Sequence, residues 1–107
     1  MNDAELLKIE QAAIEMSRRA GEILLEHFDK PLTITYKSPG QRSPVTNADQ
    51  ASDAFLRAEI LRHFPAHTVL SEEDSTTQEL SRSEITWVID PLDGTNNFMN
   101  GLPQFGV

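Results

Sequence analysis

Apolar residues recur at steps of three and four along residues 3–29, which predicts one long amphipathic helix. Charged residues such as Glu15 and Arg19 fill the opposite side, so we expect a surface helix with one buried face. Pro31 ends the pattern because proline cannot continue a helix. The positions predicted to face the core are Leu6, Ile9, Ala13, Met16, Ala20, Ile23 or Leu24, and Phe28.

A second helix is predicted from about Asn47 to Phe64, where Pro65 stops it. The helix opens on Thr46-Asn47-Ala48-Asp49, which has the spacing of a capping box, in which the acid reaches back to the capping residue. The face of this helix that is expected to be buried carries Ala51, Ala54 or Phe55, Ala58 and Leu61.

Three short runs rich in β-branched residues are predicted to be strands: residues 32–36, 68–70 and 85–89. The first helix is expected to pack on a sheet that includes the first and the last of these strands. Residues 37–44 combine prolines, a glycine and basic side chains, which favours a mobile surface loop. Residues 75–84 are polar and weakly patterned, so we expect a loop or a single helical turn there, and residues 96–99 are expected to form a short helix.

The composition is that of a globular protein. Of 107 residues, 38% are apolar and 24% are charged, which excludes intrinsic disorder and allows one domain at most. No apolar run approaches the roughly 20 residues of a membrane helix, and the acidic N-terminus lacks the apolar segment of a secretory signal, so we expect a cytoplasmic protein with no membrane partner. The chain has no cysteine, which excludes disulfides, thiolate nucleophiles and zinc–thiolate sites.

Acidic residues outnumber basic ones by 17 to 9, which gives a formal charge of −8 at pH 7. This balance argues against direct nucleic-acid binding, which needs basic patches to displace counterions. The segment from Glu72 to Asp93 holds seven acids and the single base Arg82, and so carries −6 of that charge. Two of its acidic clusters, Glu72-Glu73 and Asp90 with Asp93, lie where predicted strands end, and ligand sites of α/β sheets assemble at strand ends.

Carboxylates that converge at such a place need either a proton or a cation between them. Two like charges about 4 Å apart repel by roughly 4 kcal/mol at an effective dielectric constant near 20. Oxygen donors with no cysteine or histidine beside them favour a hard ion, Mg²⁺, Mn²⁺ or Ca²⁺, over zinc. We interpret His27, His63 and His67 as structural, because they lie at helix ends or just beyond them.

The segment Asp90-Pro91-Leu92-Asp93-Gly94-Thr95 concentrates the chemistry of the chain. Pro91 stops the preceding strand, which leaves Asp90 at its end, able to bridge two ions, and lets the Leu92 carbonyl point the same way as both carboxylates. Gly94 permits close backbone approach, and the amides of Gly94 and Thr95 at the start of a helix form an anion site suited to phosphate. The sequence therefore predicts cations and phosphate side by side.

Each of these segments also has an ordinary structural interpretation. The pattern Asp-Pro-x-Asp-Gly is common in turns, with Asp93 as a helix cap. Glu72-Glu73-Asp74 taken alone is typical of a solvated acidic turn. Asp49 taken alone is accounted for by its capping box with Thr46.

Three segments, in one order and near one spacing, resemble the inositol monophosphatase family, a branch of the metal-dependent, lithium-sensitive phosphatases. They are Pro44-Val45-Thr46-Asn47-Ala48-Asp49, Ser71-Glu72-Glu73, and Trp87-Val88-Ile89-Asp90-Pro91-Leu92-Asp93-Gly94-Thr95-Asn96-Asn97-Phe98. The resemblance implies an α/β (α+β) layered sugar-phosphatase fold. Residues 1–107 would be the N-terminal portion of one such domain, with two long helices and a partial sheet.

Two features favour a domain that is truncated at its C-terminus. Residues 103–107 end just as an apolar run resembling a strand begins, although a short docked terminal strand looks the same. The family pattern also requires a further aspartate in a Trp-Asp motif toward the C-terminus, whereas Trp87, the only tryptophan, is followed by Val88. We therefore expect residues 1–107 alone to bind metal weakly and to be inactive or weakly active.

The resemblance implies a set of metal ligands for two or three Mg²⁺ ions, with Mn²⁺ as the alternative. Glu72, Asp90 and the Leu92 carbonyl would hold the first ion. Asp90 and Asp93 would hold the second, and Glu72 would help to orient a weaker third.

The resemblance also implies residues that act on the substrate. Thr95 and Asp49, with Glu72 beside them, would help to activate the attacking water. Asp93 and the amides of Gly94 and Thr95 would bind the substrate phosphate. Lys37, in the loop of residues 37–44, matches a family lysine near the active site.

The activity implied is Mg²⁺-dependent hydrolysis of an inositol monophosphate, or of a similar sugar or polyol phosphate, by metal-activated water. Asn96-Asn97-Phe98 looks more like the inositol monophosphatase branch than the 3′(2′),5′-bisphosphate nucleotidases, which tend to carry Lys-Glu-Phe there. The resemblance leaves open nucleotidase activity, fructose-1,6-bisphosphatase activity and a non-catalytic regulatory role through protein partners. Family members are commonly homodimers, so the full-length protein is expected to be one.

Overall fold

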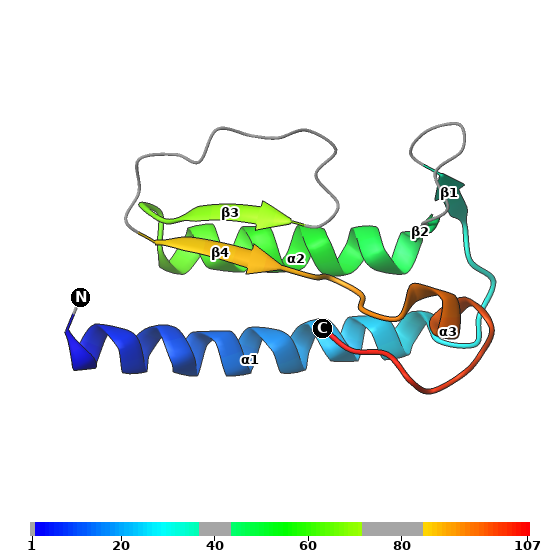
Figure 1. Ribbon diagram of the computed structural model, residues 1–107, viewed down its shortest axis with the longest axis horizontal. Helices are drawn as coiled ribbons and strands as arrows, with labels where there is room; N and C mark the ends of the chain where they lie inside the picture. Colours follow the sequence, from blue (N-terminus) through cyan, green and yellow to red (C-terminus); the bar gives the residue numbers. More distant parts are fainter. Residues whose placement is uncertain (1, 37–43, 72–84) are drawn as a thin grey trace.

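The computed structural model describes residues 2–36, 44–71 and 85–107, which form three helices and two small sheets (Figure 1). Lys37, Glu72 and the two predicted loops around residues 37–43 and 75–84 lie outside the described residues. None of the helices in the described ranges is long and apolar enough to cross a membrane. The elements in chain order are α1 (Asp3–His27), β1 (Ile34–Tyr36), β2 (Pro44–Thr46), α2 (Asn47–His63), β3 (Thr68–Ser71), β4 (Thr86–Ile89) and α3 (Thr95–Met99).

Helix α1 follows the sequence prediction closely. The Asn2 side chain caps it by accepting a hydrogen bond from the Glu5 amide at 2.9 Å, and the helix ends at His27, two residues before the predicted end. Met16, Ala20 and Leu24 are buried, as predicted, but the expected core residue Leu6 is 48% exposed. The reason is length, because α1 has 25 residues and its partner α2 only 17, which leaves the first turns of α1 without a full contact surface.

Helix α2 has the predicted bounds but buries a different face. Ala58 and Leu61, which were expected inside, are exposed. Of the alternatives Ala54 and Phe55, Ala54 is exposed, whereas Phe55 is partly buried and packs against Met16, Ala20, Leu56 and Ile60. The pattern was misleading because two of the buried positions are polar and therefore do not count toward an apolar stripe. The buried residues of this helix are Ala48, Asp49, Ser52, Leu56 and Ile60.

The strands form two separate pairs in the described residues. β1 pairs antiparallel with β2, whereas β3 pairs parallel with β4. The expectation of one sheet containing the strands near residues 32–36 and 85–89 is therefore wrong for this part of the chain. β2 was not predicted, because Pro44 was assigned to the preceding loop; proline is tolerated here as the first residue of a strand.

Two hydrophobic clusters hold these elements together. α1 and α2 run side by side in opposite directions, and α3 lies near the C-terminal end of α1 (Figure 1). One cluster joins the middle of α1 to α2, with Trp87 and Ile89 of β4 packed against it; its buried members are Met16, Ala20, Leu56 and Ile60. The other joins the end of α1, the start of α2 and α3; its buried members are Leu24, Ala48, Leu92 and Phe98.

The second cluster supports the segment of residues 90–95. The Phe98 ring is 1% exposed and packs against the rings of Phe28 and Phe105, with centroids 5.5 and 4.8 Å away. Burying a side chain of this size contributes roughly 1.5–3 kcal/mol. Apolar packing therefore fixes α3 and the end of the 90–95 segment beneath the candidate site.

Candidate functional site

The parallel register of β3 and β4 brings the C-terminal ends of both strands to one edge. Ser71, the last residue of β3, lies opposite Ile89, the last residue of β4. Asp90 follows Ile89 directly, and Glu72 follows Ser71, although Glu72 itself lies outside the described residues. A hollow of about 390 Å³ opens at this edge; it is lined by Leu70, Ser71, Val88, Ile89 and Asp90.

The 90–95 segment leaves β4 along a buried path. Pro91 is less than 2% exposed and Leu92 is 2% exposed, with the Leu92 side chain in the second hydrophobic cluster. The Ser52 hydroxyl on α2 donates a hydrogen bond to the Pro91 carbonyl at 2.7 Å. Half-buried Asp90 and exposed Asp93 therefore flank an anchored Pro-Leu pair.

Asp49 is completely buried and serves two partners, one with each carboxylate oxygen. Its Oδ2 accepts hydrogen bonds from the Thr46 amide at 2.9 Å and from the Thr46 hydroxyl at 2.5 Å. Because the Thr46 hydroxyl oxygen in turn accepts from the Asp49 amide at 3.2 Å, the predicted capping box is present. The other oxygen, Oδ1, accepts from the Thr95 hydroxyl at 3.2 Å, so the capping role leaves one oxygen facing the 90–95 segment.

The Thr95 hydroxyl has two acceptors for its single proton. Besides Asp49, the Leu92 carbonyl lies 3.1 Å from the Thr95 oxygen. A carbonyl oxygen has two lone pairs, so this contact leaves the Leu92 carbonyl able to accept a second ligand. The structure thus joins three of the predicted site residues, Asp49, Leu92 and Thr95.

Gly94 occupies a backbone conformation that suits glycine. It caps α3 with φ 83° and ψ 40°, in the left-handed region. A Cβ added here would lie 2.7 Å from the Gln104 carbonyl oxygen. The sequence predicted close backbone approach at Gly94, and the chain's own residues 104–105 make that approach.

Residues 104–106 form a strap, the docked run that the sequence left open as an alternative for residues 103–107, although its partner was not predicted. The Asp93 amide donates to the Gly106 carbonyl at 2.8 Å, and the Gly106 amide donates back to the Asp93 carbonyl at 3.0 Å. The strap fixes the backbone of Asp93, and the Asp93 amide already donates its hydrogen bond to the strap. The signal in the sequence was the apolar, strand-like run near residue 105, which gave no indication of its pairing partner.

The chemistry of the predicted donors fits a hard cation, but the described residues do not complete a site. Asp90, Asp93 and the Leu92 carbonyl offer only oxygen, the chemistry that Mg²⁺ and Mn²⁺ prefer. Within residues 2–36, 44–71 and 85–107, no three acidic, histidine or cysteine side chains come together closely enough to hold a metal. Glu72, the remaining predicted carboxylate ligand, and Lys37 lie outside these ranges.

The histidines make the contacts expected of structural side chains. The Trp87 indole donates to Nδ1 of His67 at 3.0 Å, and the His67 ring stacks on Phe64 with centroids 4.8 Å apart. Nδ1 of His27 lies 2.9 Å from the carbonyl of Ile23, one turn earlier in α1. These contacts agree with the interpretation of the histidines as structural.

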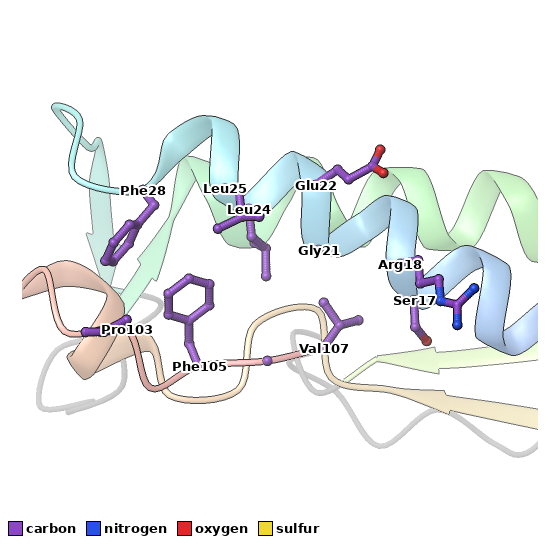
Figure 2. A pocket seen from close by; sticks show the side chains of 11 residues that line it. Ser17, Arg18, Gly21, Glu22, Leu24, Leu25, Phe28, Pro103, Phe105 and Val107 are labelled. Carbon is purple, nitrogen blue, oxygen red and sulfur yellow. The ribbon is translucent and has the colours of Figure 1, made fainter.

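A larger hollow, of about 690 Å³, lies between α1 and residues 103–107 (Figure 2). Figure 2 shows Leu24 of α1 and Phe105 facing each other across it. Its lining includes Leu24, Leu25, Phe28, Phe105 and Val107, but none of the predicted site residues. The candidate site is therefore identified by its hydrogen bonds and donor chemistry, and this hollow is separate from it.

Comparison with known proteins finds similar chains, among them these three. Nus factor SuhB of Haemophilus influenzae is 40% identical over 95 residues, covering 89% of this chain and 35% of that protein. The chloroplastic phosphatase IMPL1 of Arabidopsis thaliana is 38% identical over 108 residues, covering 100% of this chain and 27% of that protein. The solved structure of an IMPase from Thermotoga maritima superimposes on this chain with a TM-score of 0.78 and 30% sequence identity. The match covers 92% of this chain and 37% of the other.

The chain thus spans about a third of the length of these relatives. The structural likeness confirms the predicted fold class as a partial inositol monophosphatase fold. The sequence model described as "Inositol monophosphatase family" matches residues 5–107. Since this match takes in α1, α2, both strand pairs and the 90–95 segment, the chain belongs to the inositol monophosphatase family.

Proposed function

We propose that this protein is a Mg²⁺-dependent hydrolase of phosphate monoesters, with an inositol monophosphate or a similar sugar or polyol phosphate as substrate. The observation that supports this most is the hydrogen bond from Thr95 to Asp49 at 3.2 Å. It joins two motifs that are 46 residues apart in the sequence and places a carboxylate beside the hydroxyl that follows Asp93-Gly94. Family membership and the oxygen-only donor set support the same proposal.

The metal would be held by Asp90, Asp93 and the Leu92 carbonyl, together with Glu72. Glu72 is included because the family resemblance implies it, and it lies outside the described residues. When bound, Mg²⁺ makes a coordinated water more acidic and neutralises negative charge on the phosphoryl group. The anchored Pro91-Leu92 pair would keep the two aspartates at a constant separation, which metal selectivity requires.

Thr95 and Asp49 would move the proton that the attacking water loses. The water gives a proton to the Thr95 oxygen while the Thr95 hydroxyl passes its own proton to Oδ1 of Asp49. Thr46 occupies Oδ2 with two donors, so Oδ1 is the oxygen that faces Thr95. The water oxygen would then bond to phosphorus as the bond to the ester oxygen breaks. The departing alkoxide would take up a proton from solvent, and Asp49 would return its proton to solvent, so that one water is consumed overall.

The test is phosphate release from inositol 1-phosphate in the presence of Mg²⁺, measured on the protein expressed from its complete coding sequence. We expect Asp90→Asn to abolish release, because the variant loses the charge of a proposed bridging ligand. The control Asp3→Asn removes an exposed carboxylate from the first turn of α1 and should leave release unchanged. Full activity in a folded Asp90→Asn variant would contradict the proposal. Parallel assays with fructose 1,6-bisphosphate and adenosine 3′,5′-bisphosphate rank the substrates, and a clear preference for the nucleotide would overturn the inositol assignment.

A second candidate function is regulation through a protein partner, without catalysis. It is favoured by the 40% identity to a protein named as a Nus factor and by the acidic charge of −8, which suits a basic partner. The Asp90→Asn variant separates the two functions in cells. A cellular phenotype that survives this change supports regulation, and one that disappears with phosphatase activity supports catalysis.

We further propose that residues 1–107 are the N-terminal part of a single domain in a longer protein that forms a homodimer. The proposal is supported by the 35% share of the relative's length that this chain covers. The coding sequence downstream of Val107 should then contain a Trp-Asp motif that supplies another metal ligand, and its absence would contradict the proposal. Sedimentation of the complete product tests the dimer.

A further inference from the structure

Ser52 makes an unusual hydrogen bond for a serine in the middle of a helix. Such serines commonly face solvent or donate to the carbonyl four residues earlier. Ser52 is completely buried, and its hydroxyl donates at 2.7 Å to the carbonyl of Pro91, which lies 39 residues further along the chain. A buried hydroxyl destabilises the fold unless it is hydrogen bonded, and the Pro91 carbonyl supplies the acceptor that the Ser52 hydroxyl needs.

The bond fixes the orientation of one peptide plane in the candidate site. The Pro91 carbonyl belongs to the planar peptide that continues into Leu92, so holding its oxygen also sets the direction of the Leu92 amide. The proline ring already restricts φ of Pro91. This peptide lies between the two groups proposed to hold the metal, because Asp90 directly precedes Pro91 and the Leu92 carbonyl belongs to the next peptide plane.

The same face of α2 holds the 90–95 segment at its other end. Asp49 and Ser52 are three residues apart, so they are neighbours on the helix surface. Asp49 accepts from Thr95 at 3.2 Å, and Ser52 donates to Pro91. One helical turn therefore fixes both ends of the segment, and this explains why the buried face of α2 carries two polar side chains.

We propose that Ser52 is a positioning residue, which orients Asp90 and the Leu92 carbonyl by holding the peptide between Pro91 and Leu92 and thereby sets the affinity of the site for Mg²⁺. The inference rests on the proposed function, because it assigns Ser52 to the same metal site. Ser52 acts only through the Pro91 carbonyl.

The first test measures the segment itself, in the metal-free full chain. Amide exchange of Leu92–Thr95, followed by NMR, should be about tenfold faster in Ser52→Ala, because the segment loses one of its two anchors on α2. Ser52→Cys replaces the hydroxyl with a somewhat larger thiol that is a weaker donor, and it should give an intermediate rate. The control Ile60→Val removes a buried methylene from the far end of α2 and should leave these amides unchanged. Unchanged exchange in Ser52→Ala would overturn the proposal.

The second test measures Mg²⁺ affinity by calorimetry, which does not depend on turnover. Loss of groups that orient metal ligands typically weakens metal binding by 10–100-fold, and we expect about tenfold for Ser52→Ala. The Mg²⁺ affinity of Ile60→Val should match that of the unmodified protein. We expect this even if Ile60→Val lowers the midpoint of thermal unfolding as much as Ser52→Ala does. Unchanged affinity in Ser52→Ala, alongside binding by the unmodified protein, would also overturn the proposal.

The two tests separate this proposal from the proposed function. If the unmodified protein binds no Mg²⁺, the proposed function fails and so does the role of Ser52 in metal affinity. Faster exchange at Leu92–Thr95 would then still show that Ser52 holds the segment. If Mg²⁺ binds and phosphate is released but Ser52→Ala changes neither exchange nor affinity, only the role of Ser52 fails.

Discussion

Asp49→Asn should separate the stability of the fold from the proposed chemistry. The substitution keeps the size of the side chain but replaces one carboxylate oxygen with an amide. The remaining oxygen can stay with Thr46 and keep the capping box, while the new amide donates to Thr95. The Thr95 proton can then turn to the Leu92 carbonyl, which is 3.1 Å away. All the local groups therefore keep partners in the variant.

The contacts of Asp49 set the expected cost. Thr46 makes two hydrogen bonds to Oδ2, and each loses the extra strength that a charged acceptor gives, about 1 kcal/mol. We therefore expect the free energy of unfolding to fall by about 1–2 kcal/mol, a loss that a domain stable by roughly 5–15 kcal/mol tolerates. The rate should fall far more, by about 100-fold or more, because residue 49 can no longer take a proton from Thr95.

The assay combines urea unfolding with kcat for phosphate release at saturating Mg²⁺. Thr95→Val should lose a similar factor in kcat, and the double variant should lose little more than either single one, because the two groups act as a unit. Thr95→Ser keeps the hydroxyl and serves as the control that retains activity. The reasoning is refuted if a folded Asp49→Asn variant keeps kcat within about threefold of the unmodified protein, since a general base contributes at least about 100-fold.

Three further predictions concern the fold around the site. Gly94→Ala should destabilise the protein by at least the roughly 1–2 kcal/mol of a left-handed residue, because its Cβ would also lie 2.7 Å from the Gln104 carbonyl; an unchanged Tm would contradict this. Leu24→Ala, at a fully buried position, should lower the free energy of unfolding in urea by about 2–5 kcal/mol, and a loss below about 1 kcal/mol would show that the second cluster is not the support described. The hydrogen bond from Arg62 lowers the pKa of Glu59 from its ordinary value of 4.5. The difference in Tm between Glu59→Gln and the unmodified protein should therefore be present above pH 4.5 and vanish as the pH falls through the lowered pKa. A Tm difference that does not change with pH would contradict the assignment of this stabilisation to the Glu59–Arg62 hydrogen bond.

The helices were predictable because their signals are local. The three-and-four spacing of apolar residues and the capping residues Asn2 and Thr46 lie within each segment, so the bounds of α1 and α2 agree with the prediction to within two residues. The buried face of α2 was not predictable from hydrophobicity. Asp49 and Ser52 are buried because distant groups hydrogen bond to them, and periodicity carries no information about those partners.

The pairing of strands and the strap could not be predicted for a related reason. β2 has only three residues, too few to show a period, so the partner of the predicted strand near residues 32–36 could not be named. The bridge between Asp93 and Gly106 depends on how the chain returns past α3. For the candidate site, the 90–95 segment was recognisable from its residue types, whereas the contact between Thr95 and Asp49 was implied only by the family resemblance until the structure placed the two together.

The most direct test of the proposed function is a Mg²⁺ titration of phosphate release. The protein expressed from its complete coding sequence is first stripped with EDTA, and inorganic phosphate released from inositol 1-phosphate is measured as Mg²⁺ is added back. We predict no release without the ion, a saturable rise as Mg²⁺ is added, and no rise for Asp90→Asn. Release that continues in EDTA, or its absence at every Mg²⁺ concentration and with every phosphate monoester tested, would contradict a Mg²⁺-dependent phosphatase.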